Sequence, residues 1–275
     1  MKAINRKEEE FLMNRRKNAW INVVFIVVTL IFNALGAIGF FNGLSQKEIS
    51  DRYLTLITPS PSTFSIWSVI YLLLIISLVV MIIKNDNPYY QRAIEEISVL
   101  FRASCLLNIA WIIAFSYLQL VLSTIFILGF VIILSMISLK LRKIQKGRRF
   151  LLPLTFGLYT GWVFIATVVN FSATLVKLEW QGFGIGDETL AITTLLVAVV
   201  LVFLVNQSNK NASFPLPIAW AYLGIYQFLN APEGFKGQYG FLSMTALAGM
   251  VVLIGIAAIR FYLNNYALLP TKSYD

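Results

Sequence analysis

Three apolar segments of this chain each carry large aromatic rings beside hydrogen-bonding groups at helical spacing. One contains Asn108 and Trp111, three residues apart, and another contains Trp67 and Tyr71, four residues apart. Residues at these spacings share one face of a helix. A wall of rings with a few polar anchors suits a flat, mostly apolar ligand. The pattern therefore indicates a binding pocket between helices.

The third segment contains the longest stripe of this kind. Tyr159, Trp162, Ala166 and Asn170 follow one another at steps of three, four and four residues, which places them along one helix face. A purely structural role is the alternative. Asn in a membrane helix often bonds a neighbouring helix, and Trp is a common packing or interfacial residue. Spacing alone leaves both interpretations open.

The composition argues against several kinds of chemistry. The 275 residues include no histidine, which is the commonest metal ligand and general base. The single Cys105 has no second cysteine to pair with in the chain. No charged residue lies at the middle of an apolar segment, whereas coupled transporters normally need one, or broken helices. We expect no metal site, no cofactor and no catalytic residue.

The hydropathy pattern predicts the fold class. Hydrophobic residues make up 58% of the chain and charged residues 13%, against about 25% charged in a soluble domain. About 20 consecutive apolar residues span a bilayer. We therefore predict an all-α, polytopic membrane helix bundle of about eight transmembrane helices. The predicted segments are 20–42, 63–83, 99–118, 120–139, 150–173, 189–206, 214–230 and 240–262.

The positive charge is concentrated in two places. Of the 22 Lys and Arg residues, six lie within residues 1–17 and six within 140–149. By the positive-inside rule, both termini are cytoplasmic. The net charge of +9 thus reports topology and contact with the lipid bilayer, not nucleic-acid binding. We expect a multi-pass protein of the plasma (inner) membrane.

The loops and the tryptophan distribution suggest a division of the chain. Residues 43–62 form the longest predicted external loop, and Pro59 and Pro61 bias its end to an extended path that caps the bundle. Most tryptophans precede residue 181, so we read a five-helix core followed by a three-helix extension. The predicted parts are a cytoplasmic segment 1–19, a core 20–178, an extension 179–264 and a cytoplasmic tail 265–275.

The motifs on three segments resemble those of the TspO/MBR (translocator protein, tryptophan-rich sensory protein) family. The matching residues are Pro59, Pro61, Phe64, Trp67 and Tyr71; Leu107, Asn108 and Trp111; and Tyr159, Trp162, Ala166 and Asn170. The resemblance covers residues 20–178. The chain departs from the family pattern where Leu158 replaces a usual proline and where the loop lacks a tryptophan before its prolines. Its last three helices have no counterpart in the five-helix form.

The resemblance implies a function and a set of ligand-binding residues. It implies that a porphyrin (tetrapyrrole), a sterol or a similar planar molecule binds in a pocket closed by the first loop. The implied ligand-binding residues are Pro59, Pro61, Phe64, Trp67, Tyr71, Asn108, Trp111, Tyr159, Trp162, Ala166 and Asn170. We expect an integral-membrane binding or sensory protein. Porphyrin breakdown has support from the resemblance alone, so binding is favoured and an enzymatic role stays open.

Two further alternatives stay open. The protein could transport a small lipophilic molecule, if Pro215 and Pro217 make a broken helix in the extension. The resemblance also implies a homodimer, and Gly39 and Gly43, read as part of the first helix, have the spacing of a close helix contact. Packing of these glycines within one chain is the alternative.

Overall fold

The computed structural model describes residues 2–271, and in that range it is helical with no strands. This confirms the predicted all-α, polytopic bundle. The long helices are α1 (Lys2–Ala37), α3 (Ile66–Ile83), α4 (Pro88–Ser116), α5 (Leu120–Ile144), α6 (Leu151–Lys177), α7 (Asp187–Asn209), α8 (Leu216–Asn230) and α9 (Gly240–Leu263). A short α2 (Gln46–Arg52) and two 3-10 turns, η1 (Pro61–Ser65) and η2 (Gly182–Gly184), lie in the connections.

Seven helices of the described range are long and apolar enough to cross a membrane. The remaining long helix, α8, has 15 residues, or about 22 Å at the usual rise per residue, and is shorter than the hydrocarbon core. It is continuous, with Pro217 in its first turn. The broken helix that would have favoured a transporter is therefore absent from the described part of the extension.

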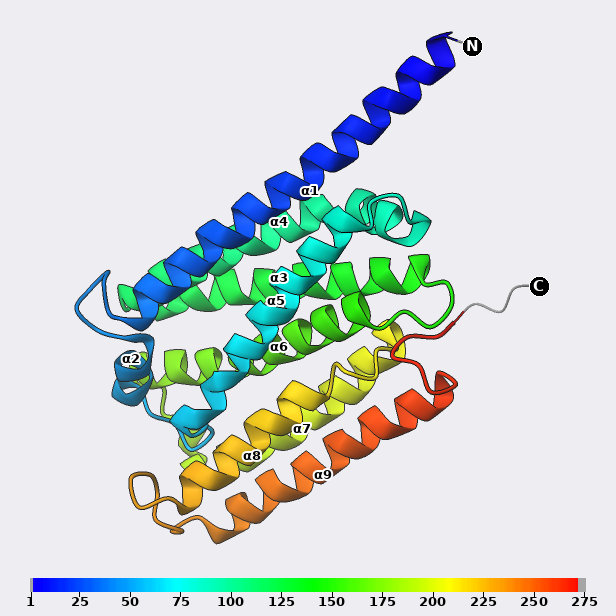
Figure 1. Ribbon diagram of the computed structural model, residues 1–275. Helices are drawn as coiled ribbons and strands as arrows, with labels where there is room; N and C mark the ends of the chain where they lie inside the picture. Colours follow the sequence, from blue (N-terminus) through cyan, green and yellow to red (C-terminus); the bar gives the residue numbers. More distant parts are fainter. Residues whose placement is uncertain (1, 272–275) are drawn as a thin grey trace.

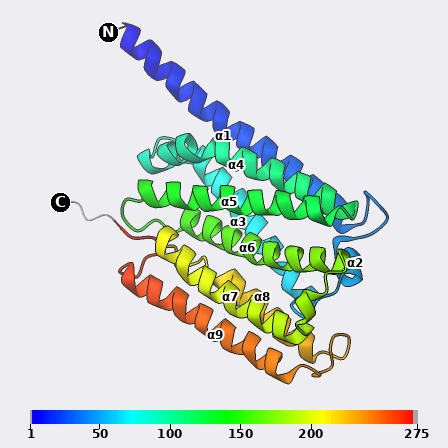
Figure 2. The same cartoon turned by 180° about the vertical axis from the view of Figure 1, so that it is seen from behind.

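The helices form one elongated bundle with α3 crossing the others obliquely (Figure 1). In sequence order, α4 packs against α1, α5 against α4, and α6 against α5, while α8 contacts α6 and α9. Figure 2 shows the same order from behind. Helix α1 begins and α9 ends at the same end of the bundle. The chain therefore crosses the bundle an even number of times.

Two glycines of α6 seat the extension on the core. A methyl group on Gly161 would lie 2.1 Å from the Phe214 carbonyl oxygen, and one on Gly157 would lie 2.0 Å from Ser213 Oγ. Asn211 Nδ2 also donates to the Pro153 carbonyl oxygen at 2.8 Å. The turn before α8 therefore lies directly on the α6 backbone, and no residue larger than glycine fits at either position.

The expected small-residue face of the first helix was wrong. Helix α1 ends at Ala37, and Gly39 and Gly43 lie beyond it with φ of +75° and +70°. These left-handed conformations make a turn, which glycine adopts without steric cost. Gly36 is helical, but a methyl group there would lie 2.9 Å from Ile112 of α4. The homodimer remains a prediction without this interface.

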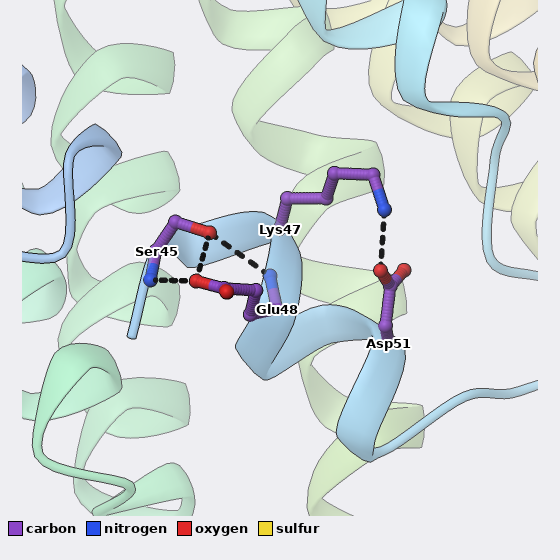
Figure 3. Close-up of polar contacts among 4 residues, drawn as sticks. All are labelled: Ser45, Lys47, Glu48 and Asp51. Carbon is purple, nitrogen blue, oxygen red and sulfur yellow. Dashed lines mark hydrogen bonds and ion pairs between the residues drawn. The ribbon is translucent and has the colours of Figure 1, made fainter. Parts of the chain in front are cut away.

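The first loop also differs from expectation, because it contains a helix. Ser45 caps α2: its side chain accepts from the Glu48 backbone N–H, and the Glu48 carboxylate accepts from the Ser45 backbone N–H. Figure 3 shows this capping box, which satisfies backbone donors at a helix start. Lys47 and Asp51, which are one turn apart on the same helix, form an ion pair.

Candidate ligand-binding site

Trp67 lies at the centre of a cluster of aromatic rings. It stacks on Tyr71 with ring centroids 5.1 Å apart, and its ring meets Trp162 nearly at right angles with centroids 6.0 Å apart. Trp111 lies 6.4 Å away in a tilted arrangement. Phe64 adds an edge contact to Trp162 at 6.0 Å. Helices α3, α4 and α6 thus bring their rings together at one place.

These rings line a small cavity, which we name the aromatic chamber. Its volume is about 70 Å³. Of the residues singled out in the sequence, those lining it are Pro59, Phe64, Trp67, Trp111, Trp162, Ala166 and Asn170. The other lining residues are Gln46, Ser50, Phe115, Ile165, Val169, Ala173 and Ala221. The wall is therefore mostly apolar and includes residues from α2 and α8.

A second space, the α1–α3 groove, adjoins the chamber. It has a volume of about 490 Å³, and Pro61 and Tyr71 lie on its wall together with Asn33. The two spaces share Gln46, Phe64 and Trp67 among their lining residues. The rings of Phe64 and Trp67, together with Gln46, therefore lie between the chamber and the groove.

Asn108 and Tyr159 are fully buried and do not belong to the described lining of either space. Instead they belong to a polar network between helices. Tyr71 donates to Asn33 Oδ1 at 2.6 Å, Asn33 donates to Asn108 Oδ1 at 2.9 Å, and Asn108 donates to the Tyr159 hydroxyl at 3.1 Å. These groups satisfy one another, so the network holds α1, α3, α4 and α6 together.

Asn170 lines the chamber, but its amide is also bonded within the protein. Trp111 Nε1 donates to Asn170 Oδ1 at 3.1 Å. The Asn170 amide nitrogen donates to Ser123 Oγ at 3.0 Å and to Thr124 Oγ1 at 2.7 Å. This amide therefore links α6 to α4 and α5.

Trp162 differs from its neighbours. It is 2% exposed, and its indole Nε1 has no hydrogen-bond partner within the described residues. A buried donor without an acceptor is costly and calls for an explanation. Trp162 is also one of the residues that line the chamber.

A family model described as "TSPO-like protein" matches residues 19–259. The chain belongs to the TSPO-like family. The matched range continues beyond residue 178 through α7 and α8 and most of α9, so the family model includes most of the three-helix extension. Searches of curated proteins and of solved structures found no match.

In this TSPO-like chain, the extension holds the end of the first loop in place. Ser60 donates its backbone N–H to the Gly224 carbonyl oxygen at 3.0 Å, and Trp220 Nε1 donates to the Thr63 carbonyl oxygen at 2.9 Å. A methyl group on Gly224 would lie 2.0 Å from Thr63 Oγ1. Helix α8 thus supports the segment that leads into Phe64 and Trp67.

Helix α2 covers the chamber from the loop side, with Gln46 and Ser50 among the lining residues. Hydrogen bonds from the Ser45 side chain and then from its backbone lower the pKa of the Glu48 carboxyl. Because the pKa of Glu48 is lower in the folded protein, the capping box contributes its full stabilisation above the normal pKa of a glutamate carboxyl. This stabilisation is lost as the pH falls through the lowered pKa.

The sequence pattern did not single out several residues of the chamber and the adjoining α1–α3 groove. Asn33 could have been found, because it is an amide inside an apolar segment, as Asn108 is. Gln46 and Ser50 lie in a polar loop, where nothing in the pattern sets them apart. Ala221 of α8 reaches the chamber through the docking of the extension, which no local pattern encodes.

Proposed function

We propose that this TSPO-like membrane protein binds a planar hydrophobic ligand, such as a porphyrin or a sterol, in the aromatic chamber. The observation that carries this proposal is the unpartnered Nε1 donor of buried Trp162. The surrounding rings would stack on the ligand, and an acceptor atom of the ligand would accept a hydrogen bond from Trp162 Nε1. A bonded amide such as Asn170 contributes shape rather than recognition.

The ligand must enlarge the chamber when it binds. Pockets for small molecules usually have volumes of roughly 300–1,000 Å³, whereas the chamber holds about 70 Å³. The adjoining α1–α3 groove holds about 490 Å³. Rotation of Phe64 and Trp67 would join the two spaces, because these rings belong to both walls. We propose that the ligand enters from the groove and displaces these two rings.

A titration with protoporphyrin tests the proposal. In detergent, purified protein should show saturable quenching of tryptophan fluorescence with the porphyrin absorbance unchanged. The Trp162→Phe variant should bind severalfold more weakly, because the smaller ring leaves contact area unfilled and the donor is gone. Loss of porphyrin absorbance in light but not in the dark would indicate that the protein breaks down the porphyrin, and the proposal of a binding protein would be wrong.

Trp20→Phe is the matched control. Trp20 is 56% exposed near the start of the membrane-spanning part of α1, so its variant should bind like the parent protein. Equal affinities for the Trp20 and Trp162 variants, both folded, would show that the aromatic cluster only packs. A cholesterol analogue titrated in the same way separates a sterol site from a porphyrin site.

We also propose that both termini face the cytoplasm. The test uses a background in which buried Cys105 is replaced by Ala. Phe183, which is 90% exposed between α6 and α7, and exposed Lys146 at the other end of the bundle are each changed to Cys. In intact cells an impermeant thiol reagent should label the Phe183→Cys variant. The Lys146→Cys variant should react only after permeabilisation, and the reverse pattern would overturn the orientation.

A further inference from the structure

A third hollow lies between the core and the extension, and we name it the outer groove. Its volume is about 440 Å³. Its walls come from the first loop, the end of α6, the start of α7 and the connection before α9. The lining residues are Leu54, Thr55, Leu56, Ile57, Phe171, Ser172, Leu175, Val176, Trp180, Asp187, Leu190, Ala191, Thr194, Phe235 and Tyr239. It shares no lining residue with the aromatic chamber.

The aromatic side chains of the outer groove come from separate segments. Trp180, 40% exposed, follows α6. Phe235 and Tyr239 precede α9 with their rings in an edge contact at 5.6 Å. Phe171 of α6 lies on the same wall and is 51% exposed. The face of an aromatic ring attracts a cation electrostatically.

Asp187 is the one charged residue in the described lining of this groove. Its carboxylate is exposed and forms no ion pair within the described part of the chain. Asp187 lies in the first turn of α7, where the helix dipole stabilises a negative charge. This helix position accounts for an ionised carboxylate, but it does not account for the aromatic walls beside it.

The surrounding loops reinforce the negative charge. Residues 174–188, which include the end of α6, contain Lys177, Glu179, Asp187 and Glu188, and residues 231–239 contain Glu233 and Lys236. Four acidic and two basic residues give these two segments a formal charge of −2. The field at the groove mouth therefore favours a cation.

We propose that the outer groove binds an organic cation with an apolar body, such as a quaternary ammonium compound. The rings would contact the cationic head and its alkyl groups, and Asp187 would neutralise its charge. The apolar residues from α6 and the first loop would cover the remainder. This site is independent of the proposed function of the chamber.

Binding of labelled tetraethylammonium to the purified full-length protein, measured by equilibrium dialysis, tests the proposal. Binding should saturate. Unlabelled choline should displace the label, whereas its uncharged analogue 3,3-dimethylbutanol should not. The Asp187→Asn variant should bind about tenfold more weakly, and the Trp180→Leu variant several-fold more weakly.

Glu188→Gln is the matched control, since it removes the same charge from the next residue, which is absent from the described lining. It should change the affinity less than twofold. If Asp187→Asn and Glu188→Gln lowered the affinity for tetraethylammonium equally, the cause would be long-range electrostatic attraction and not contact with Asp187. This result would overturn the proposed site. Displacement by dimethylbutanol, or no saturable binding, would also overturn it. The Trp162→Phe variant should bind the cation normally, which separates this result from that of the chamber.

Discussion

The polar network and the aromatic chamber differ in how their polar groups are bonded. In the network, Asn33, Asn108 and Tyr159 form a chain of hydrogen bonds in which each group has a partner. In the chamber, the Trp162 indole donor is buried at a cavity and lacks one. Both arose from the same sequence pattern of rings and amides at helical spacing. Helical spacing therefore indicates which face a polar group lies on, whereas its hydrogen-bond partners depend on how the separate helices pack.

The largest effect should follow from a change that moves the chamber wall but leaves the polar network in place. Gly224→Val adds a side chain where a Cβ atom would already lie 2.0 Å from Thr63 Oγ1. Overpacking of this kind costs about 1–3 kcal/mol, and here it should push the first loop off α8. We expect a lower melting temperature in detergent and at least tenfold weaker protoporphyrin binding.

Gly255→Val is the control for this change, because an added Cβ at Gly255 of α9 meets no atom within 4 Å. It should leave melting and binding near the parent values. If Gly224→Val also behaved like the parent protein, the contact between α8 and the first loop would not shape the chamber.

The next effect should separate the network from the chamber. Asn108→Leu removes the acceptor for Asn33 and the donor to Tyr159. Loss of a buried partner costs about 1–3 kcal/mol, although bonds between membrane helices average about 0.6 kcal/mol. We expect about 1 kcal/mol lower stability by reversible unfolding in mixed micelles, with the porphyrin affinity of the folded protein changed less than twofold.

A double variant sharpens this result. Tyr159→Phe added to Asn108→Leu should cost less than the sum of the two single changes, because the hydroxyl no longer needs a partner. Additive losses would mean that the network does not couple the helices. A large loss of affinity in Asn108→Leu would move this amide into the ligand site.

The fold was predictable from the sequence because each membrane helix carries its own signal in length and apolarity. The position of the rings on α3, α4 and α6 also followed from periodicity. The partners of the amides did not, since Asn33, Ser123 and Thr124 become neighbours only through the relative rotation of separate helices. The support of the first loop by α8 could not be predicted either, because it depends on contact between the backbones of Ser60 and Gly224, which are 164 residues apart in the sequence.

The smallest effect should come from Trp220→Phe. This change tests whether ligand binding in the chamber depends on one hydrogen bond between α8 and the first loop. The change removes the donor to the Thr63 carbonyl oxygen but keeps an aromatic ring at a position that is 40% exposed. Because the backbone bond from Ser60 to Gly224 remains, the loop should stay in place and bind protoporphyrin about twofold more weakly. The loss from a neutral hydrogen bond is about 0.5–1.5 kcal/mol, and partial exposure should place the effect at the lower end. A loss as large as that of Gly224→Val would mean that this one indole hydrogen bond, and not the packing of α8 against the loop, holds the chamber wall in place.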